Sequence, residues 1–440
     1  MIFDFFKDTS FDFDKTSYHT TNGIFYVDTY FINVDQKCPY CGSYDLYNDG
    51  YKVKNVKHCT NYTRLIEVTL HIKRFKCKDC LCTFYEHDDF SIPSCNLSKE
   101  SLLMILEELK KPTATFESTA EIFHLNRQNI IDYFDRYFNY SPPTSLPEVM
   151  SWDEKHVNKS MTDHSYLFVI YDWSNKKIYD ILNTRHKFTL TKYFGKYSYE
   201  ERSKVKYITI DMWETYREVA KIYFKNAILC VDSFHVMENI NRAMNEVRCS
   251  VMAKYNKKTE SLDDNDPYYY YLKKYDYFFL KDFEDLPEVV RNEKLKCRWS
   301  KSEMRKYLLS IDDRLEKAYD LVASYRSFNK YTNSNNCTDE YYKLIEMFLQ
   351  SNMKPFINVG NMLYHWKDEI LNSFIRIKDN EGNVRRLSNG PIERVNSTIK
   401  QIYMNGHGYD NFFRFRNRII YVINKDLKIQ NNPLELERNK

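Results

Sequence analysis

The alternation of apolar and polar residues along the chain separates strand-rich from helix-rich stretches. Residues 64–72 alternate with period two, which predicts a strand. Residues 97–140 carry apolar positions at helical spacing, and the proline-rich stretch 141–147 predicts a linker after them. Residues 1 to about 35 are aromatic and show no clear period, so we expect them to be irregular.

Beyond residue 148, strands and helices alternate. The apolar runs predict five strands, at residues 149–153, 166–172, 178–182, 205–211 and 227–232. The second and third strands form a predicted hairpin, and helical stretches separate the last three. Three antiparallel strands followed by helix, strand, helix and strand is the order of the ribonuclease-H-like fold. Helical patterns without a strand signal follow from about 236 to 375, and the last helices span about 391–428.

Length and composition add bounds to this picture. A chain of 440 residues predicts two to four folded units, and 43% hydrophobic with 29% charged residues predicts a globular protein. The net charge of +4 is too small to argue for nucleic acid, so that case needs local clusters. The chain has no apolar run of membrane-spanning length, and its acidic, aromatic start is unlike a signal peptide. We therefore expect a cytoplasmic, reducing location, where the 11 cysteines are metal ligands or buried thiols.

Four cysteines form a metal-binding pattern. Cys38 and Cys41 make one Cys-x-x-Cys turn, and Cys77 with Cys80 makes a second one beyond the predicted strand. Two such turns supply the four thiolates of a tetrahedral zinc site, which predicts a zinc ribbon. Redox or incidental cysteines are the alternative. Cys82 could replace Cys80, and the neighbours His58 and Cys59 could also compete as ligands.

A helix-turn-helix follows the cysteines. Residues 117–123 and 127–138 are the two predicted helices, with Ala120 as the small residue at their contact. Asn126 is placed to cap the second helix. Its first turn then offers Arg127, Gln128 and Asn129 to base edges or phosphates. A plain helical hairpin without DNA contact is the alternative, and the preceding ribbon favours DNA binding.

Three acidic residues are candidates for a catalytic site. Asp153 and Asp211 each end a predicted strand, and Glu393 lies in the first turn of a helix that Asn389 can cap. Asn396 and Lys400 follow on the same helix face as Glu393. Carboxylate oxygens bind hard cations, and two Mg²⁺ (or Mn²⁺) ions can activate water and stabilise a leaving oxygen in phosphodiester cleavage. For each acid alone, a helix cap or a surface charge is the alternative.

The order of these motifs resembles the ISL-three family of bacterial insertion-sequence transposases. The matching blocks include Asn226 to Val236, and the last two, Ser388 to Lys400 and Gly408 to Phe415, are highly specific. The resemblance implies a DDE catalytic domain of ribonuclease-H-like fold, interrupted by a helical insertion. It assigns Asp153, Asp211 and Glu393 as the three acids. Trp152 departs from the family, which usually has an aliphatic residue there.

The same resemblance concerns a second acidic motif. Asp232 and His235 look like the [Cys/Asp]-x-x-His element of related transposases, and we interpret them as a substrate-positioning pair. Structural packing is an equal alternative. Asp232 is also the rival to Asp211 as the second acid, because it too ends a predicted strand.

The predicted architecture is a multidomain α/β protein with six segments. They are an extension at 1–36, a zinc ribbon at 37–92, a helix-turn-helix at 97–140, a first catalytic part at 148–235, a helical insertion at 236–380 and a C-terminal catalytic part at 381–428.

The predicted function is that of a DNA transposase that cuts inverted-repeat ends and joins them to target DNA. Double-stranded DNA is the expected partner, bound by a homodimer or larger assembly, with Zn²⁺ in the ribbon. Candidates for phosphate contact, or else for solvated helix surface, are Arg385, Arg386, Arg414, Arg416 and Arg418, together with Lys400. The alternatives are a non-catalytic DNA-binding regulator and a nuclease that cuts without joining.

Overall fold

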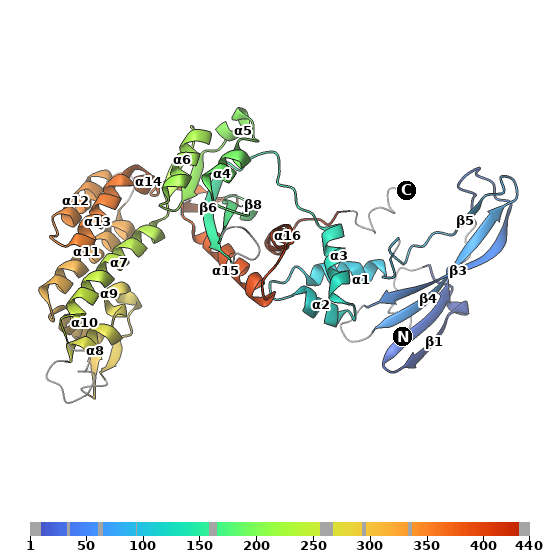
Figure 1. Ribbon diagram of the computed structural model, residues 1–440, viewed down its shortest axis with the longest axis horizontal. Helices are drawn as coiled ribbons and strands as arrows, with labels where there is room; N and C mark the ends of the chain where they lie inside the picture. Colours follow the sequence, from blue (N-terminus) through green and yellow to red (C-terminus); the bar gives the residue numbers. More distant parts are fainter. Residues whose placement is uncertain are drawn as a thin grey trace. The chain divides into compact units, whose positions relative to one another are not determined.

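A computed structural model describes most of the chain as two compact units (Figure 1). The described residues are 10–32, 36–59, 65–93, 95–157, 165–255, 267–292, 296–332 and 337–430. The first unit comprises Met1–Ser141, Asn158–Asp163 and Val395–Lys440. The second comprises Pro142–Val157 and His164–Arg394. The first unit is therefore built from both ends of the chain, and the predicted segment 381–428 divides after Arg394.

The sheet of the first unit has the order β1-β2-β4-β3, with β5 also paired to β4. Its strands are β1 (Ser17–Thr21), β2 (Ile24–Tyr30), β3 (Leu46–His58), β4 (Ile66–Cys77) and β5 (Thr83–Tyr85). Alternate residues of β4, starting at Ile66, are buried, which confirms the period-two strand; the predicted start at residue 64 lies outside the described residues. A small apolar core that includes Phe11, Val27 and Phe90 fills this side of the sheet.

The expectation that residues 1–35 are irregular is wrong for residues 17–30. β1 and β2 form an antiparallel hairpin, and β2 then pairs in parallel with β4. The turn residues Asn22 and Gly23 both have positive φ, at 52° and 79°. An Asn-Gly pair is a strong hairpin signal for this reason. A short 3₁₀ helix, Phe13–Lys15, precedes the hairpin.

Helices complete the first unit. They are α1 (Lys99–Glu108), α2 (Phe116–Ile122), α3 (Arg127–Tyr137), α16 (Phe412–Ile423) and the Val395–Asn405 part of α15 (Gly390–Asn405). The predicted helix pair is present, and the Asn126 side chain caps α3 by accepting the N–H of Asn129 at 2.8 Å. Tyr421 of α16 packs its ring against Phe138, with centroids 4.4 Å apart. The C-terminal helix is thus part of the same core as the helix-turn-helix.

The sheet of the second unit has the order β10-β9-β6-β7-β8. Its strands are β6 (Val149–His156), β7 (Tyr166–Asp172), β8 (Lys177–Leu182), β9 (Tyr207–Ile210) and β10 (Ile228–Val231). β6, β7 and β8 pair antiparallel, whereas β6 with β9 and β9 with β10 pair in parallel. All five strands predicted from the sequence are present, and the first three are antiparallel as predicted.

Aromatic packing fixes one face of this sheet. Trp152 of β6 is fully buried and stacks on Phe194 of α4 (Lys187–Phe194), with centroids 4.9 Å apart. Tyr216 of α6 (Glu214–Tyr223) and Phe224 meet the same ring edge-on. Between α4 and α6 lies α5 (Tyr199–Ser203), and Figure 1 shows α4 and α6 beside β6 and β8. Because side chains alternate along a strand, Trp152 on this face places Asp153 on the other.

The rest of the second unit is mainly helical. Its helices are α7 (Ser233–Met252), α8 (Tyr268–Lys274), α9 (Tyr277–Leu280), α10 (Lys301–Leu309), α11 (Asp313–Tyr331), α12 (Cys337–Leu349), α13 (Lys354–His365) and α14 (Lys367–Asn372), with a 3₁₀ helix at Phe283–Asp285. The prediction that residues 236–375 contain no strand is wrong. β11 (Val289–Asn292) and β12 (Cys297–Ser300) form a hairpin. Its strands are only four residues long and hold charged residues, too little for a period-two signal. A second hairpin joins β13 (Arg376–Lys378) and β14 (Val384–Arg386).

A membrane-spanning role has no support in the helices that the structure describes. None of them is both long enough and apolar enough to cross a bilayer.

We expect Arg418→Met to destabilise the first unit. The buried Arg418 guanidinium donates to the backbone carbonyls of Leu109, Lys111 and Ala114, and burial lowers its pKa to about 10. Without it these carbonyls lose a charged donor, so the free energy of unfolding should fall by about 3 kcal/mol. Urea unfolding of the full chain measures the change, with Arg127→Met, at an exposed position, as the control. Equal unfolding midpoints for the two variants would contradict this role.

Candidate functional site

The three predicted acids all belong to the second unit. Asp153 lies on β6, Asp211 directly follows β9, and Glu393 is in the first turn of α15, where its N–H bonds the Asn389 carbonyl at 3.0 Å. Ser151 and Thr209 are register partners in the parallel pair β6–β9. Asp153 and Asp211 each follow one of these partners by two positions. The two aspartates therefore share the sheet face opposite to α4 and α6.

Asp211 is the best-anchored of the acids. His235, in the first turn of α7, places Nε2 at 2.8 Å from Asp211 Oδ1. Asn389 Nδ2 donates to the same oxygen at 3.2 Å. On the opposite edge of the imidazole ring, His235 Nδ1 lies 3.6 Å from the Glu238 carboxylate. Asp211 thus has a fixed orientation with one carboxylate oxygen engaged by two donors.

Burial and mutual repulsion shape the electrostatics of the acids. Burial is the main reason that the pKa of Asp153 rises to about 8, and the charge of Asp211 adds to it. Burial also raises the pKa of Glu393, and there the charges of Asp232 and Asp211 act in the same direction. Asp211 is an acidic neighbour of both Asp153 and Glu393. Such a group of acids needs a positive charge to remain ionised.

His235 supplies positive charge in the absence of a metal. Burial alone would lower its pKa, but the bond to Asp211 and the nearby Asp232 and Asp153 outweigh burial and raise it to about 9. The imidazole is therefore protonated at neutral pH. Asp232 accepts the N–H of Phe234 at 3.5 Å as the cap of α7, and burial raises its pKa. The predicted pair lies beside the acids, with His235 on Asp211 and Asp232 at the helix start.

The acids fit a hard divalent cation in chemistry, although their oxygens are not gathered at one point. Carboxylate oxygens are the ligands that Mg²⁺ and Mn²⁺ prefer. Asp232 Oδ2 is buried without a hydrogen-bond donor, as a ligand atom awaiting a cation would be. Within the described residues, only the four cysteines discussed below bring three or more ligand atoms within 4.8 Å of one another. Asp211 is thus near enough to raise the pKa of both Asp153 and Glu393, but the carboxylate oxygens are more widely spaced than in a finished coordination shell.

Asn389 is a site residue that the sequence reasoning assigned differently. Its side chain was expected to cap α15, but it is fully buried and its Oδ1 lies 2.5 Å from the Thr209 hydroxyl. Thr209 in turn lies 2.7 Å from the Ser151 hydroxyl. The amide therefore connects the start of α15 to β9 and to Asp211. No local pattern could reveal this, because the Asn389 and Thr209 positions are 180 residues apart.

Glu154 is adjacent to Asp153 but has its own partners. Its carboxylate forms an ion pair with Arg185 and accepts the Tyr216 hydroxyl at 2.9 Å. Arg185 lies over the Trp213 ring, 4.4 Å from its centroid. Glu154 is thereby neutralised and does not compete for the role of Asp153.

The cysteine cluster of the first unit could bind zinc. The sulfurs of Cys38, Cys41, Cys77 and Cys80 all lie within 4.8 Å of one another, with 3.5 Å between Cys38 and Cys80 and between Cys41 and Cys77. A tetrahedral site with Zn–S bonds of ~2.3 Å has similar sulfur separations. Burial would raise the pKa of Cys38, but the backbone N–H groups of Tyr40 and Cys41 lower it to about 7. A thiolate is the form that binds metal.

The other candidate ligands are occupied elsewhere. The backbone N–H of Cys82 donates to the Cys80 sulfur. The thiol of Cys82 does not belong to the four-sulfur cluster. His58 bonds the Ser98 hydroxyl at 2.8 Å, and Cys59 donates to the Phe123 carbonyl at 3.3 Å. The fourth position of the cluster is therefore Cys80.

The candidate DNA-contact residues divide into exposed and buried groups. Arg127 and Gln128 are exposed at the start of α3 and Asn129 is half-buried, whereas Arg385 is exposed beside Asp379. Lys400 is exposed on α15, four residues beyond the half-buried Asn396. Arg414 is half-buried and forms a two-pronged pair with Asp135, at 2.7 and 2.9 Å.

Of three other arginines from that prediction, Arg416 and Arg418 are buried and Arg386 is half-buried. Arg386 donates to the Ser373 carbonyl at 2.7 Å and lies over the Phe374 ring. Arg416 donates to the Tyr140 carbonyl at 3.0 Å, and Arg418 is fully buried. Their guanidinium groups already serve backbone acceptors, so these three have structural roles instead of free phosphate-contact surfaces.

One comparison with known proteins is positive. A family model described as a transposase, of the DDE type and the ISL-three group, matches residues 150–419, which is more than half of the chain. No curated protein matches the chain. The matched segment contains Asp153, Asp211, Asp232 and Glu393 and begins after the cysteine cluster.

We expect Cys80→Ser to abolish zinc binding and Cys82→Ser to leave it intact. Only the Cys80 sulfur belongs to the four-sulfur cluster, and three thiolates hold zinc less firmly than four. Elemental analysis of the purified proteins gives zinc per chain. A loss of zinc from the Cys82→Ser protein but not from the Cys80→Ser protein would reverse the assignment.

We expect Asn389→Ala to weaken Mn²⁺ binding by about 10–100-fold, the usual effect of removing a group that orients a metal ligand. The variant leaves Asp211 without its second donor and disconnects α15 from Thr209. Mn²⁺ titration followed by electron paramagnetic resonance measures the affinity. The control is Asn380→Ala, an exposed asparagine of the same unit. An unchanged affinity in a folded Asn389→Ala protein would show that the amide does not orient the site.

Proposed function

The chain belongs to the ISL-three family of transposases, and on this premise we propose that it cuts DNA at the inverted-repeat ends of an insertion sequence and joins these ends to target DNA. The observation that carries the proposal is the arrangement around Asp211. This acid is held by His235 and Asn389, and its charge raises the pKa of both Asp153 and Glu393. The ionised form of buried acids that repel one another is unfavourable unless bound cations neutralise their charge.

We infer that the catalytic domain has a ribonuclease-H-like fold. The sheet order is β10-β9-β6-β7-β8, with three antiparallel strands and two parallel additions, and it agrees with the three antiparallel strands followed by helix, strand, helix and strand that the sequence predicts. It supports this assignment because it brings the ends of β6 and β9 side by side. The helical segment between α7 and β13 is then the insertion that precedes the last acid.

The proposed catalytic residues are Asp153, Asp211 and Glu393. When bound, two divalent cations would supply an activated water and a stabilised leaving oxygen. The chain's own contribution is to hold the acids: β6 and β9 fix the two aspartates, and α15 presents Glu393. His235 and Asn389 orient Asp211 from opposite elements, as positioning residues. Asp232, with its unbonded oxygen, stays the rival to Asp211 as a ligand.

The first unit is the proposed DNA-binding part. A zinc ribbon at Cys38, Cys41, Cys77 and Cys80 would stabilise the sheet, and α3 would present Arg127, Gln128 and Asn129 to the terminal repeats. Arg385 and Lys400 are exposed cations suited to phosphate contact. Pairing of two element ends requires at least two active sites, so we propose that a dimer or larger assembly forms on DNA.

We expect Glu393→Gln to lower the rate of DNA cleavage by on the order of 10⁴–10⁶-fold, the scale seen when one member of a catalytic set is removed. The substrates are labelled duplexes of the DNA that borders the gene, with Mg²⁺ or Mn²⁺. Binding should persist, because Glu393 belongs to the second unit and the proposed base contacts of α3 belong to the first. The control is Glu316→Gln, at an exposed position of α11.

Each other outcome selects a different function. Binding without cleavage by the unchanged protein would favour a DNA-binding regulator. Cleavage without joined products would favour a nuclease. Full activity of the Glu393→Gln protein would remove this acid from the catalytic set.

A further inference from the structure

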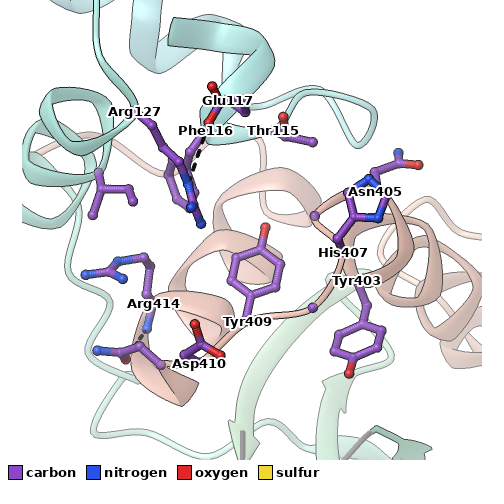
Figure 2. A pocket seen from close by; sticks show the side chains of 14 residues that line it. Thr115, Phe116, Glu117, Arg127, Tyr403, Asn405, His407, Tyr409, Asp410 and Arg414 are labelled. Carbon is purple, nitrogen blue, oxygen red and sulfur yellow. Dashed lines mark hydrogen bonds and ion pairs between the residues drawn. The ribbon is translucent and has the colours of Figure 1, made fainter. Parts of the chain in front are cut away.

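A pocket of about 470 Å³ lies within the first unit, between the helix-turn-helix and the segment that joins α15 to α16. The first wall carries Glu117 of α2 and Arg127 of α3; the second carries His407, Tyr409, Asp410 and Arg414. Figure 2 shows Arg127 reaching down from the first wall and the Tyr409 hydroxyl pointing up from the second. The pocket thus opens at the first turn of α3, the helix proposed to read DNA.

The second wall is shaped to hold Tyr409 in place. A Cβ on Gly406 would come within 2.8 Å of the Tyr409 ring, so only glycine allows this close approach. His407 and Gly408 both have positive φ, at 52° and 97°, which turns the chain back toward α16. The Tyr409 ring then packs on Phe415, with centroids 4.6 Å apart. The turn therefore fixes an aromatic ring whose polar end faces the pocket.

Polar groups in the pocket are left without hydrogen bonds inside the protein. Within the described residues, the Tyr409 hydroxyl has no hydrogen-bond partner, and the Arg127 guanidinium has only a 4.0 Å contact with Glu117. The Arg127 side chain is 62% exposed. Arg414 differs, because Asp135 holds it from outside the pocket. Hydrogen-bond donors that face a cavity and have no acceptor within the protein are suited to bind a polar ligand.

The charges of the walls decide the kind of ligand. Two arginines are balanced by the two carboxylates of Glu117 and Asp410, and Arg414 is already paired. A bare phosphate would gain little from such walls. A neutral flat group with both donors and acceptors along its edge fits better, and a nucleobase has that character. The volume is within the ~300–1,000 Å³ range of pockets that take organic ligands.

We propose that this pocket receives one nucleobase, turned out of the stack of the DNA bound by α3. The inference rests on the proposed DNA-binding function. Arg127 and the Tyr409 hydroxyl would bond the edge of the base, and Glu117 or Asp410 would accept from its amino group. Unstacking costs a few kcal/mol and is least for a weakly paired base. The pocket would therefore favour DNA ends with a deformable step at this position.

Fluorescence of 2-aminopurine tests the proposal. Duplexes of the DNA that borders the gene carry this base analogue at one position each, and its emission rises when it leaves the stack. We expect one position to brighten on binding of the full chain. Arg127→Ala and Tyr409→Phe should each lower that increase about fivefold, the loss expected for one net hydrogen bond. Tyr409→Phe removes a hydroxyl that has no partner in the protein, so folding is preserved.

Arg136→Ala is the matched control, because Arg136 is an exposed arginine of α3 that does not line the pocket. Binding or cleavage without a bright position would overturn the pocket proposal and leave the transposase proposal standing. If Arg127→Ala instead weakened binding to all duplexes equally and reduced the salt slope by about one, the ligand would be a phosphate, and the proposal would also be overturned. Absence of DNA binding by the unchanged protein would defeat both proposals.

Discussion

Repulsion between buried carboxylates is the constraint on which the second unit depends. Asp153, Asp232 and Glu393 each lose hydration on burial, and the negative charge of Asp211 acts on all three. The fold tolerates this group because His235 and Asn389 both donate to Asp211. His235 comes from the start of α7 and Asn389 from the residue before α15. The position of Asp211 thus depends on α7 and α15, which are distant in sequence, both beginning next to it.

The two candidate metal sites differ in how complete they are without a metal. Four sulfurs of the first unit already have the spacing of a tetrahedral site, set by two tight turns and the strands between them. The carboxylates of the second unit have no such closure. The difference agrees with their proposed roles. A structural metal needs a closed shell of ligands, whereas a catalytic one needs free positions for water and substrate.

Strand ends and cysteine turns could be predicted from the sequence because their signals are local. The apolar runs located β6 and β9, and with them Asp153 and Asp211. Asn389 could not be assigned correctly, because a helix cap is the local interpretation of an asparagine before Gly-Pro and its real partner is Thr209. Arg416 and Arg418 were predicted as surface residues, but α16 is buried on all sides from Phe415 to Val422. The β1–β2 hairpin is different, because the Asn22-Gly23 pair is itself a local turn signal.

The discontinuous make-up of the first unit has a consequence for biosynthesis. Arg418 satisfies the carbonyl of Ala114, which precedes it by 304 positions. A ribosome that adds ~5–20 residues per second reaches Arg418 roughly 15–60 s after Ala114. During that interval the turn at Lys111 has no guanidinium to complete it, and α3 lacks the ring of Tyr421. The nascent amino-terminal part therefore acquires its final core only after α16 has been synthesised.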